Sequence, residues 1–373
     1  MYVSKEHIYG LLRECIHKKD LKGGRRVQCI IITNGFFQIN ILSNNLIRLF
    51  ASCGCLLEAN LVFCSIPQPS VLSWEAIISA YASSGRHDVA LTLYHTMNVE
   101  GIEVNRCIFL SILKGSTSDG YGVKRGMTIH NEIMRNGFDS DKAVMNSLID
   151  MYAKSGNLDE AQKVFDKTVN RDIVSFSAMI TGYTLHGYGS LALSLFEKLH
   201  EQDEKLDKVT FLTALKACSN EASVRQGRLI HDELIESGFE SDMLIGSAVI
   251  DMYAKCGALK KAHELFVEIP FRDVVSWSAL MAGYAQLGND TDVVELFNKM
   301  IREDIEPDPV SFTIVLNVCN HSGQLDKGQM YIQMISTTYS ITPTLVHHIC
   351  MVDLFGRAGN FEIAVAMIKK VPI

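Results

Sequence analysis

The sequence predicts an all-α protein, a right-handed α-solenoid of about eleven helix-turn-helix repeats of 31–36 residues each. The first observation behind this prediction is internal similarity. Residues 150–165 read DMYAKSGNLDEAQKVF, and residues 251–266, which lie 101 residues further on, read DMYAKCGALKKAHELF. Weaker copies cover 48–63 and 353–368. Self-similarity at a fixed spacing is typical of a stacked array and argues against a domain with one closed core.

The second observation is the order of the segments between those copies. A segment like VSWSALMAGYAQLG (275–288) follows, and a segment like TFLTALKACSNEASVRQGRLIHDELIESGF (210–239) comes next. After a stub of residues 1–4, aligning the turns yields eleven consecutive repeats, the last incomplete: 5–39, 40–70, 71–105, 106–141, 142–172, 173–207, 208–242, 243–273, 274–308, 309–344 and 345–373. Their lengths are 35, 31, 35, 36, 31, 35, 35, 31, 35, 36 and 29, so that long, short and ordinary repeats alternate.

Each repeat has the pattern of two helices. In repeat 142–172, Val144 and Leu148 fall at helical spacing, and Gly156 ends the first helix where a left-handed residue is needed. The second helix carries an apolar stripe that ends in Phe165, a residue type that recurs at this place along the chain. One such pair cannot bury its apolar face alone, so we expect neighbouring repeats to stack and share a continuous core.

The composition agrees with one elongated solenoid. The chain is 47% hydrophobic, and its seven prolines leave most of the predicted helices unbroken. No Gly/Ser-rich or low-complexity linker divides the chain into separate domains. No run approaches 18 consecutive apolar residues, so we expect no membrane span and no membrane partner.

The cysteines and histidines follow the repeat, which favours packing roles over metal binding. Two sets of cysteines occupy equivalent positions, namely Cys15, Cys218 and Cys319, and Cys53 with Cys256. There is no C-x-x-C, so we expect reduced, buried thiols and no metal site. His130 and His231 are also equivalent, whereas His347 and His348 are neighbours that face different directions on a helix. The sequence predicts no cofactor.

Enzyme signatures are missing from the chain. It contains no G-x-x-x-x-G-K-[ST], no H-E-x-x-H and no G-x-S-x-G, and no G-x-G-x-x-G follows a strand. The many carboxylates fall mostly on the outer faces of second helices, where a solvated face explains them. The sequence therefore predicts that this chain is not an enzyme.

The alternation of 35-, 31- and 35–36-residue repeats, with VSWSALMAGY, DMYAKCG and GRLIHDELIESGF, resembles the PLS subfamily of plant pentatricopeptide repeat (PPR) proteins. The resemblance covers 5–373. It implies sequence-specific binding of single-stranded RNA, one nucleotide per repeat, usually in mitochondria or chloroplasts. Many proteins of this kind specify sites of cytidine-to-uridine editing.

The resemblance also implies which residues read the bases, namely the fifth and the last residue of each repeat. In the family, Ser or Thr in fifth place goes with purines and Asn with pyrimidines, while Asp in last place goes with G or U and Asn with A or C. The pairs here are Asn44 with Ser70, Glu75 with Asn105, Asn146 with Asp172, Ser177 with Asp207, Ser247 with Asp273, and Ser278 with Asp308. They suggest C, an open base, U, G, G and G.

The remaining repeats have no readable pair. Their fifth residues are Tyr9, Leu110, Leu212, Thr313 and Ile349. With the amino end at the 5′ side, the expected target is n-C-n-n-U-G-n-G-G-n-n.

Helix capping is the competing explanation for the aspartates. Six of them directly precede a predicted first helix, where Asp is a good N-cap worth about 1 kcal/mol: Asp141, Asp172, Asp207, Asp242, Asp273 and Asp308. Two of these, Asp141 and Asp242, end long repeats whose fifth residue is leucine. Capping thus explains the aspartates without RNA.

The charge is unusual for an RNA-binding protein, because the formal net charge is −7. Only the first 39 residues are basic, with seven Lys and Arg against three acids, or +4, which leaves −11 for the remainder. We therefore expect base contacts to carry much of the affinity, and the salt dependence to be shallow.

The two ends of the sequence also indicate what the protein does. No transit peptide is visible, because the first repeat begins at Lys5. In many relatives an E extension and a DYW deaminase domain follow the repeats. The chain ends without either one, and it lacks the C-x-x-C that the zinc deaminase needs. The prediction is an organellar RNA-processing or C-to-U editing-site recognition factor without its own catalytic domain. It would either recruit a DYW-type deaminase or an editing accessory protein in trans, or act through binding alone by protecting or masking a transcript. The alternative is a protein-binding helical scaffold whose concave surface holds a peptide or a helix, with no RNA ligand.

Overall fold

The structure is a computed structural model that describes residues 4–115, 122–202 and 205–369. All regular structure within these ranges is helical, as 22 α-helices and one short 3-10 helix (Phe36–Gln38). The expected all-α class is therefore confirmed. The chain divides into two compact halves, Met1–Gly182 and Tyr183–Ile373, which are described in turn.

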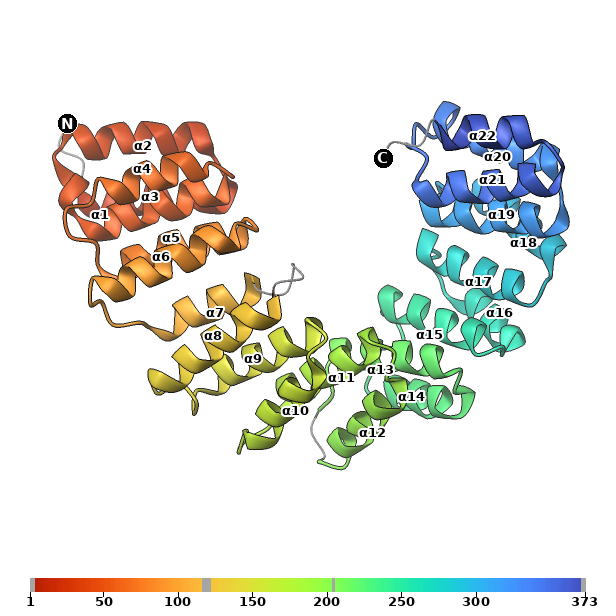
Figure 1. Cartoon of the computed structure of the whole chain (residues 1–373), viewed down its shortest axis with the longest axis horizontal. Helices are drawn as coiled ribbons and strands as arrows, with labels where there is room; N and C mark the ends of the chain where they lie inside the picture. Colours follow the sequence, from red (N-terminus) through yellow and green to blue (C-terminus); the bar gives the residue numbers. More distant parts are fainter. Residues whose placement is uncertain (1–3, 116–121, 203–204, 370–373) are drawn as a thin grey trace. The chain divides into compact units, whose positions relative to one another are not determined.

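The N-terminal half consists of consecutive helix pairs (Figure 1). The first helices of its repeats are α1 (Lys5–Lys18), α3 (Asn40–Ser52), α5 (Val71–Ser83), α7 (Arg106–Gly115) and α9 (Lys142–Lys154). The second helices are α2 (Leu21–Thr33), α4 (Leu56–Cys64), α6 (His87–Val99), α8 (Gly122–Arg135) and α10 (Leu158–Lys167). The division between the halves falls within α11 (Ile173–Leu185).

The C-terminal half continues the same order from α12 (Gly189–His200). Its first helices are α13 (Lys208–Glu221), α15 (Met243–Lys255), α17 (Val274–Gln286), α19 (Pro309–Ser322) and α21 (Leu345–Arg357). Its second helices after α12 are α14 (Val224–Glu236), α16 (Leu259–Glu268), α18 (Asp290–Arg302), α20 (Leu325–Thr337) and α22 (Phe361–Ile368). In both halves, the first helix of each predicted repeat begins at the first residue of that repeat.

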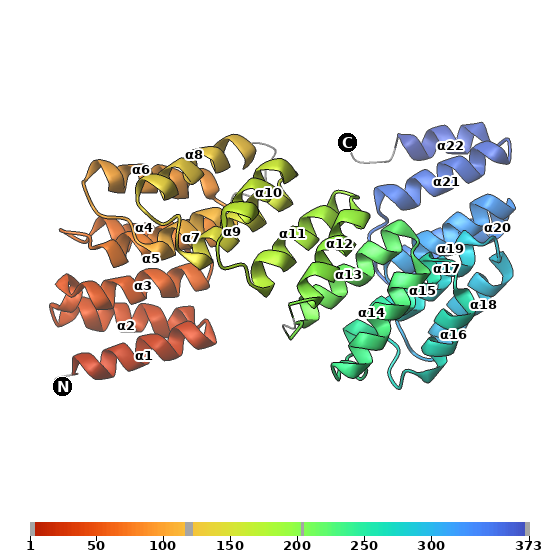
Figure 2. The same cartoon turned by 90° about the horizontal axis from the view of Figure 1, so that it is seen from below.

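Each half has two layers of helices. The first helices pack on one another, in the series α1, α3, α5, α7, α9 and the series α13, α15, α17, α19, α21. Within each half, second helices pack against their own first helix and against the first helix that follows, as α2 does with α1 and α3, and α14 with α13 and α15. Figure 2 shows these pairs from a second direction. The core of each half is therefore a continuous strip between the layers, as expected when no pair can bury its apolar face alone.

Aromatic pairs join each short repeat to the repeat that follows it. The phenylalanine near the end of the second helix meets the fourth residue of the next first helix edge to face. The ring centroids lie 4.7 Å apart for Phe63 and Trp74, 5.0 Å for Phe165 and Phe176, and 4.6 Å for Phe266 and Trp277. Edge-to-face pairs add about 0.5–1.5 kcal/mol to the burial of their area. The recurring phenylalanine is thus a packing residue between repeats.

In two of the short repeats, an arginine caps the C-terminal end of the second helix. Arg272 donates from Nε to the carbonyl of Phe266 (2.8 Å) and from Nη2 to the carbonyl of Val267 (2.9 Å). Its guanidinium also lies 5.1 Å from the centre of the Phe266 ring. Arg171 makes the same contacts at the end of α10. A cation at the last carbonyls of a helix satisfies orphan acceptors and matches the helix dipole.

We expect Arg272→Ala to destabilise the protein by about 2 kcal/mol, because charged hydrogen bonds to carbonyls contribute about 1.5–3 kcal/mol each and these carbonyls can be partly rehydrated. The measurement is the urea midpoint followed by circular dichroism. Arg302→Ala is the matched control, since Arg302 donates to the carbonyl of Asn298 within its own helix (3.3 Å) and does not cap another helix end among the described residues. Equal losses for the two variants would contradict the capping role.

Two equivalent histidines are packed against tyrosines. The Nδ1 of His130 lies 3.2 Å from the hydroxyl of Tyr152, and the Nδ1 of His231 lies 3.2 Å from the hydroxyl of Tyr253. Burial lowers the pKa of both histidines below the ordinary value of 6.5. The folded chain therefore holds them neutral where the unfolded chain would begin to protonate them.

This packing predicts a loss of stability in mild acid. A lowered folded pKa means that the stabilisation is fully present above pH 6.5 and is lost as the pH falls from there through the folded pKa. Thermal midpoints at pH 7.5 and pH 5.5 test this. A double variant with His130→Gln and His231→Gln should lose less on acidification than the parent, and Gln28 already occupies the equivalent place in the first repeat. An unchanged loss would assign the acid sensitivity to other groups.

The residues considered for metal binding have other partners. Cys218 and Cys319 are buried, and burial raises the pKa of their thiols to about 12 and about 11. Nδ1 of His347 accepts from the N–H of Thr344 (3.0 Å), and its Nε2 donates to the carbonyl of Pro309 (2.7 Å). No group of three or more His, Cys, Asp or Glu that could hold an ion occurs among the described residues. Nor does any helix in the described ranges have the length and apolar character of a membrane span.

Candidate nucleic-acid interface

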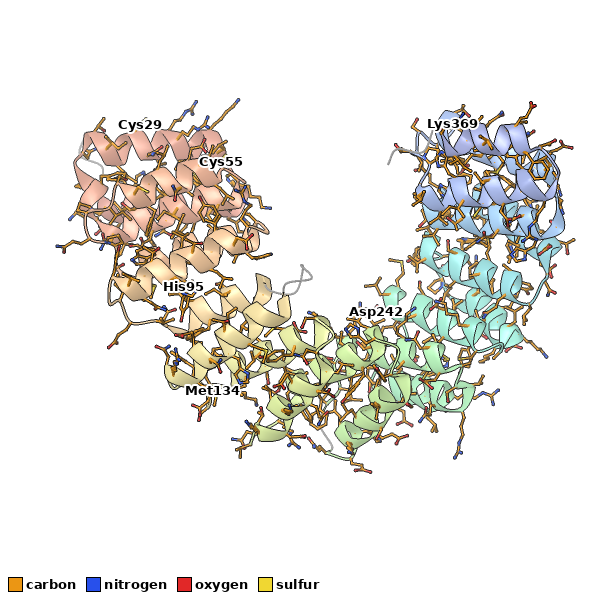
Figure 3. The ribbon with its side chains drawn as sticks, viewed as in Figure 1. Cys29, Cys55, His95, Met134, Asp242 and Lys369 are labelled. Atoms are coloured by element: carbon orange, nitrogen blue, oxygen red, sulfur yellow. The ribbon has the colours of Figure 1, made fainter. Side chains whose placement is uncertain are left out.

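The aspartates in last place cap the first helix of the following repeat. In all six cases a carboxylate oxygen accepts from the backbone N–H three residues further on. The pairs are Asp141 with Val144 (3.1 Å), Asp172 with Ser175 (3.0 Å), Asp207 with Thr210 (2.8 Å), Asp242 with Ile245 (3.2 Å), Asp273 with Ser276 (2.8 Å) and Asp308 with Ser311 (2.8 Å). Figure 3 labels Asp242 at the start of α15. Capping is therefore a real role of these residues, whatever else they do.

Asn146 and Asp172 form a direct pair. The side-chain N–H of Asn146 donates to Oδ1 of Asp172 (3.0 Å), and Lys142 lies 3.0 Å from Oδ2. Burial alone would raise the pKa of Asp172, but hydrogen bonds from the Ser175 N–H, Lys142 and Asn146 outweigh it and lower the pKa. The fifth and last residues of this repeat thus present a charged carboxylate and an amide side by side, although they are 26 residues apart.

The two serine pairs of the C-terminal half are connected in different ways. The hydroxyl of Ser247 donates directly to Oδ1 of Asp273 (3.0 Å). The hydroxyl of Ser278 lies 2.9 Å from that of Ser311, which in turn donates to Oδ1 of Asp308 (2.7 Å). Ser278 therefore reaches its aspartate through one intervening hydroxyl.

Glu75 and Asn105 also meet. The amide of Asn105 donates to Oε2 of Glu75 (2.8 Å), and Arg48 from the preceding repeat lies 3.2 Å from Oε1. The carbonyl oxygen of Asn105 caps its own following helix at the N–H of Ile108 (3.1 Å). Arg48 therefore fixes Glu75, and the bond to Ile108 fixes Asn105.

Of the two remaining predicted pairs, Asn44 and Ser70 are not linked by a hydrogen bond within the described part of the chain. Asn44 is 5% exposed and its Oδ1 has no hydrogen-bond partner among the described residues. Ser70 instead accepts from and donates within a capping box with Ser73. Ser177 and Asp207 lie in different halves of the chain, so their pairing stays a prediction. Four of the six predicted pairs are therefore brought together, three directly and one through Ser311.

The fifth residues of the unreadable repeats offer little polar contact. Leu110 and Leu212 are half-buried, and Tyr9 and Ile349 are exposed. Thr313 donates its hydroxyl to the carbonyl of Pro309 one turn earlier (2.8 Å). These repeats therefore differ in chemistry from those with a polar pair.

An exposed apolar row at the second position of the repeats was missed in the sequence. Its members are Ile41, Leu72, Val174, Val209, Leu244, Val275, Val310 and Val346, with 47–58% of each residue exposed. Residues three apart share a helix face, so each member lies one turn before a fifth residue. Large apolar side chains exposed in a regular series favour a ligand with flat apolar faces. Their recurrence at one position was the available signal.

The Lys and Arg residues at the first position of several repeats were also not identified from the sequence. Arg106 lies 3.7 Å from Asp141, Lys142 lies 3.0 Å from Asp172, and Lys208 lies 2.6 Å from Asp242. The bond from Lys208 is the main cause of the lowered pKa of Asp242. Because each cation already faces a carboxylate of its own repeat, the first-helix surface has no uncompensated basic stripe at these three places.

Comparisons with known protein families agree with the repeat pattern. A model described as the PPR repeat family matches residues 272–321, and one described as pentatricopeptide repeat-containing protein matches 70–168. A third, the PPR repeat, matches 174–203 and 247–274.

Similar proteins occur in Arabidopsis thaliana. One pentatricopeptide repeat-containing protein is 32% identical over 360 residues, which are 96% of this chain and 58% of the relative. A putative mitochondrial one is 34% identical over 364 residues, with 97% and 58% covered. A chloroplastic one is 31% identical over 363 residues, with 97% and 52% covered. This chain thus spans little more than half the length of these relatives.

Two solved structures share the fold. The crystal structure of the pentatricopeptide repeat protein PPR10 from maize has a TM-score of 0.59 and 13% identity, covering 99% of this chain and 64% of PPR10. PPR10 in complex with an 18-nt psaJ RNA element has a TM-score of 0.60 and 18% identity, covering 99% and 63%.

Proposed function

We propose, from the premise that this chain belongs to the pentatricopeptide repeat family, that it binds single-stranded RNA in a sequence-specific way, with one nucleotide for each repeat. The observation that carries the proposal is the hydrogen-bonded pair formed by the fifth and last residues of a repeat, which recurs in several repeats. One turn before the fifth residue, the second residue of the repeat exposes an apolar side chain. Support also comes from PPR10, whose structure was solved with an RNA element.

The physical mechanism follows from those two groups of residues. Unpaired RNA bases expose Watson–Crick edges that polar side chains can recognise. The pair of Asn146 and Asp172 supplies an amide and a carboxylate for one edge, and the bond between them limits the orientations that either can take. Exposed residues such as Val174 and Val275 would lie against the faces of the bases. Stacking of this kind is tolerant of sequence, so the polar pair would supply the selectivity.

The proposed target keeps the order n-C-n-n-U-G-n-G-G-n-n, with the amino end of the chain at the 5′ side. In more detail, the protein would be a PLS-type factor of mitochondria or chloroplasts that recognises an RNA-processing or editing site. It assigns no chemical step to this chain, so a deaminase or accessory protein would act in trans. Relatives named as mitochondrial and as chloroplastic support the organellar part.

A competition titration tests the proposal. The protein should bind an RNA of the proposed sequence at least tenfold more tightly than a scrambled RNA of the same composition, because each mismatch typically costs about 1–3 kcal/mol. The affinity should also fall only gently as salt is raised from about 50 to 200 mM, since few phosphates would be neutralised. Equal binding of the two RNAs would contradict the proposal, and no binding to either would favour the protein-binding scaffold.

A further inference from the structure

We infer that repeat 71–105 selects guanine at the third nucleotide of the target, through the carboxylate of Glu75 held between Arg48 and Asn105. This inference rests on the proposed function and supplies a base that the family pattern leaves open.

Glu75 is unusual among the residues in fifth place. It is the only acid among the eleven, where the others are Tyr9, Asn44, Leu110, Asn146, Ser177, Leu212, Ser247, Ser278, Thr313 and Ile349. Its side chain is only 14% exposed, yet it carries a carboxylate. A charged group that is largely removed from water needs partners, and here both partners are donors.

The partners fix the orientation of the carboxylate. Arg48 donates to Oε1 (3.2 Å) and Asn105 donates to Oε2 (2.8 Å). The amide of Asn105 cannot turn its oxygen towards Glu75 without losing the cap at Ile108. An ionised carboxylate has about four lone-pair sites, so each oxygen keeps capacity for one further donor. The result is two parallel acceptors with a guanidinium beside them.

A cleft of suitable size opens at this carboxylate. It has a volume of about 660 Å³ and lies along α3, α5 and α7 within the N-terminal half. Sites for small ligands usually measure about 300–1,000 Å³, so a nucleotide fits. Its polar lining includes Arg48, Glu75, Ser79, Ser83, His87 and Lys114. In addition, Nδ1 of His87 is buried and has no partner among the described residues.

The chemistry of the four bases distinguishes guanine. Two parallel acceptors match two adjacent donors, and among the Watson–Crick edges only guanine offers them, at N1–H and N2–H2. Its O6 would lie beside these donors, where a guanidinium such as that of Arg48 can donate to it. Adenine, cytosine and uracil each place an acceptor next to their single donor position. That acceptor would face the second carboxylate oxygen without a hydrogen, which leaves a buried polar group unsatisfied.

The experiment uses four RNAs of the proposed target that differ only at the third nucleotide. The parent protein should bind the guanine RNA at least fivefold more tightly than each of the others, as expected for one bidentate contact. Glu75→Gln should abolish the preference for guanine, because an amide has one acceptor and one donor group in place of two acceptors and no longer matches two adjacent donors. Glu295→Gln is the matched control, since it removes the same charge from an exposed position on α18, and it should keep the preference.

The possible results of this titration distinguish a failure of guanine selection by Glu75 from a failure of RNA binding as such. If the parent binds the four RNAs more tightly than the scrambled RNA but does not discriminate among them, or prefers another base at the third nucleotide, the inference fails and the proposed function stands. A guanine preference that persists in Glu75→Gln also overturns the inference. If none of the four RNAs binds, both fall together. The parent measurements decide the matter even if the variant folds poorly.

Discussion

Replacing Trp277 by alanine should lower the free energy of unfolding by about 3–5 kcal/mol, the cost typical of removing a fully buried aromatic ring. The indole is completely buried and meets the ring of Phe266 edge to face at 4.6 Å. It lies in the first turn of α17 and packs against α16 of the preceding repeat, so the substitution opens a cavity at the junction between two repeats.

Urea denaturation followed by circular dichroism measures this loss. Trp277→Phe is the matched control, because Phe176 occupies the same place in repeat 173–207 and packs against Phe165 at 5.0 Å. The phenylalanine variant should lose roughly 1–2 kcal/mol, since it keeps the aromatic contact but leaves part of the volume empty. A loss from Trp277→Ala as small as that from Trp277→Phe would show that the junction can collapse around a missing ring.

Replacing Ser278 by asparagine should shift the preference at the ninth nucleotide from guanine towards uracil, with a change in relative affinity of roughly tenfold, or about 1.4 kcal/mol. The serine hydroxyl reaches Asp308 only through Ser311. Asparagine is longer, and in repeat 142–172 the same residue type bonds directly to its aspartate at 3.0 Å. The substitution should therefore convert the repeat to the chemistry of the Asn146 and Asp172 pair.

The measurement compares RNAs with G and with U at the ninth position, for the parent and the variant. Ser237→Asn is a suitable control, because it makes the same chemical change at an exposed residue after α14. The control should keep the guanine preference. An unchanged preference in Ser278→Asn would mean that the register assigned to the repeats is wrong.

The repeat pattern allowed much of the local structure to be predicted. Helix starts depend on short-range signals, so an aspartate before an apolar stripe was enough to predict the caps at Asp141 through Asp308. The pairing of Asn146 with Asp172 was implied by the resemblance to PPR proteins, in which the fifth and last residues of a repeat act together. Periodicity alone could not have predicted that these two side chains lie close together.

Features that depend on stacking, or that occur in only one repeat, were harder to predict. The bond from Arg48 to Glu75 joins residues of different repeats, and Glu75 is the only acid in fifth place, so the repeat pattern did not indicate it. The exposed row that includes Leu72 and Val275 was overlooked because apolar residues were assumed to face the core. Their second position lies outside the buried stripe, and their recurrence at that position was the signal that the sequence offered.

The double role of the last-place aspartates limits how this protein can be retargeted. Asp172 and Asp273 each hold the start of the next helix while contacting the fifth residue of their own repeat. In the proposed mode of RNA binding, a change of the aspartate would alter base preference and weaken a cap worth about 1 kcal/mol at the same time. Changes at the fifth residue carry no such penalty. Variants that acquire new targets should thus accumulate substitutions at fifth positions first, and Asn, itself a good cap, should be the commonest replacement for the aspartate.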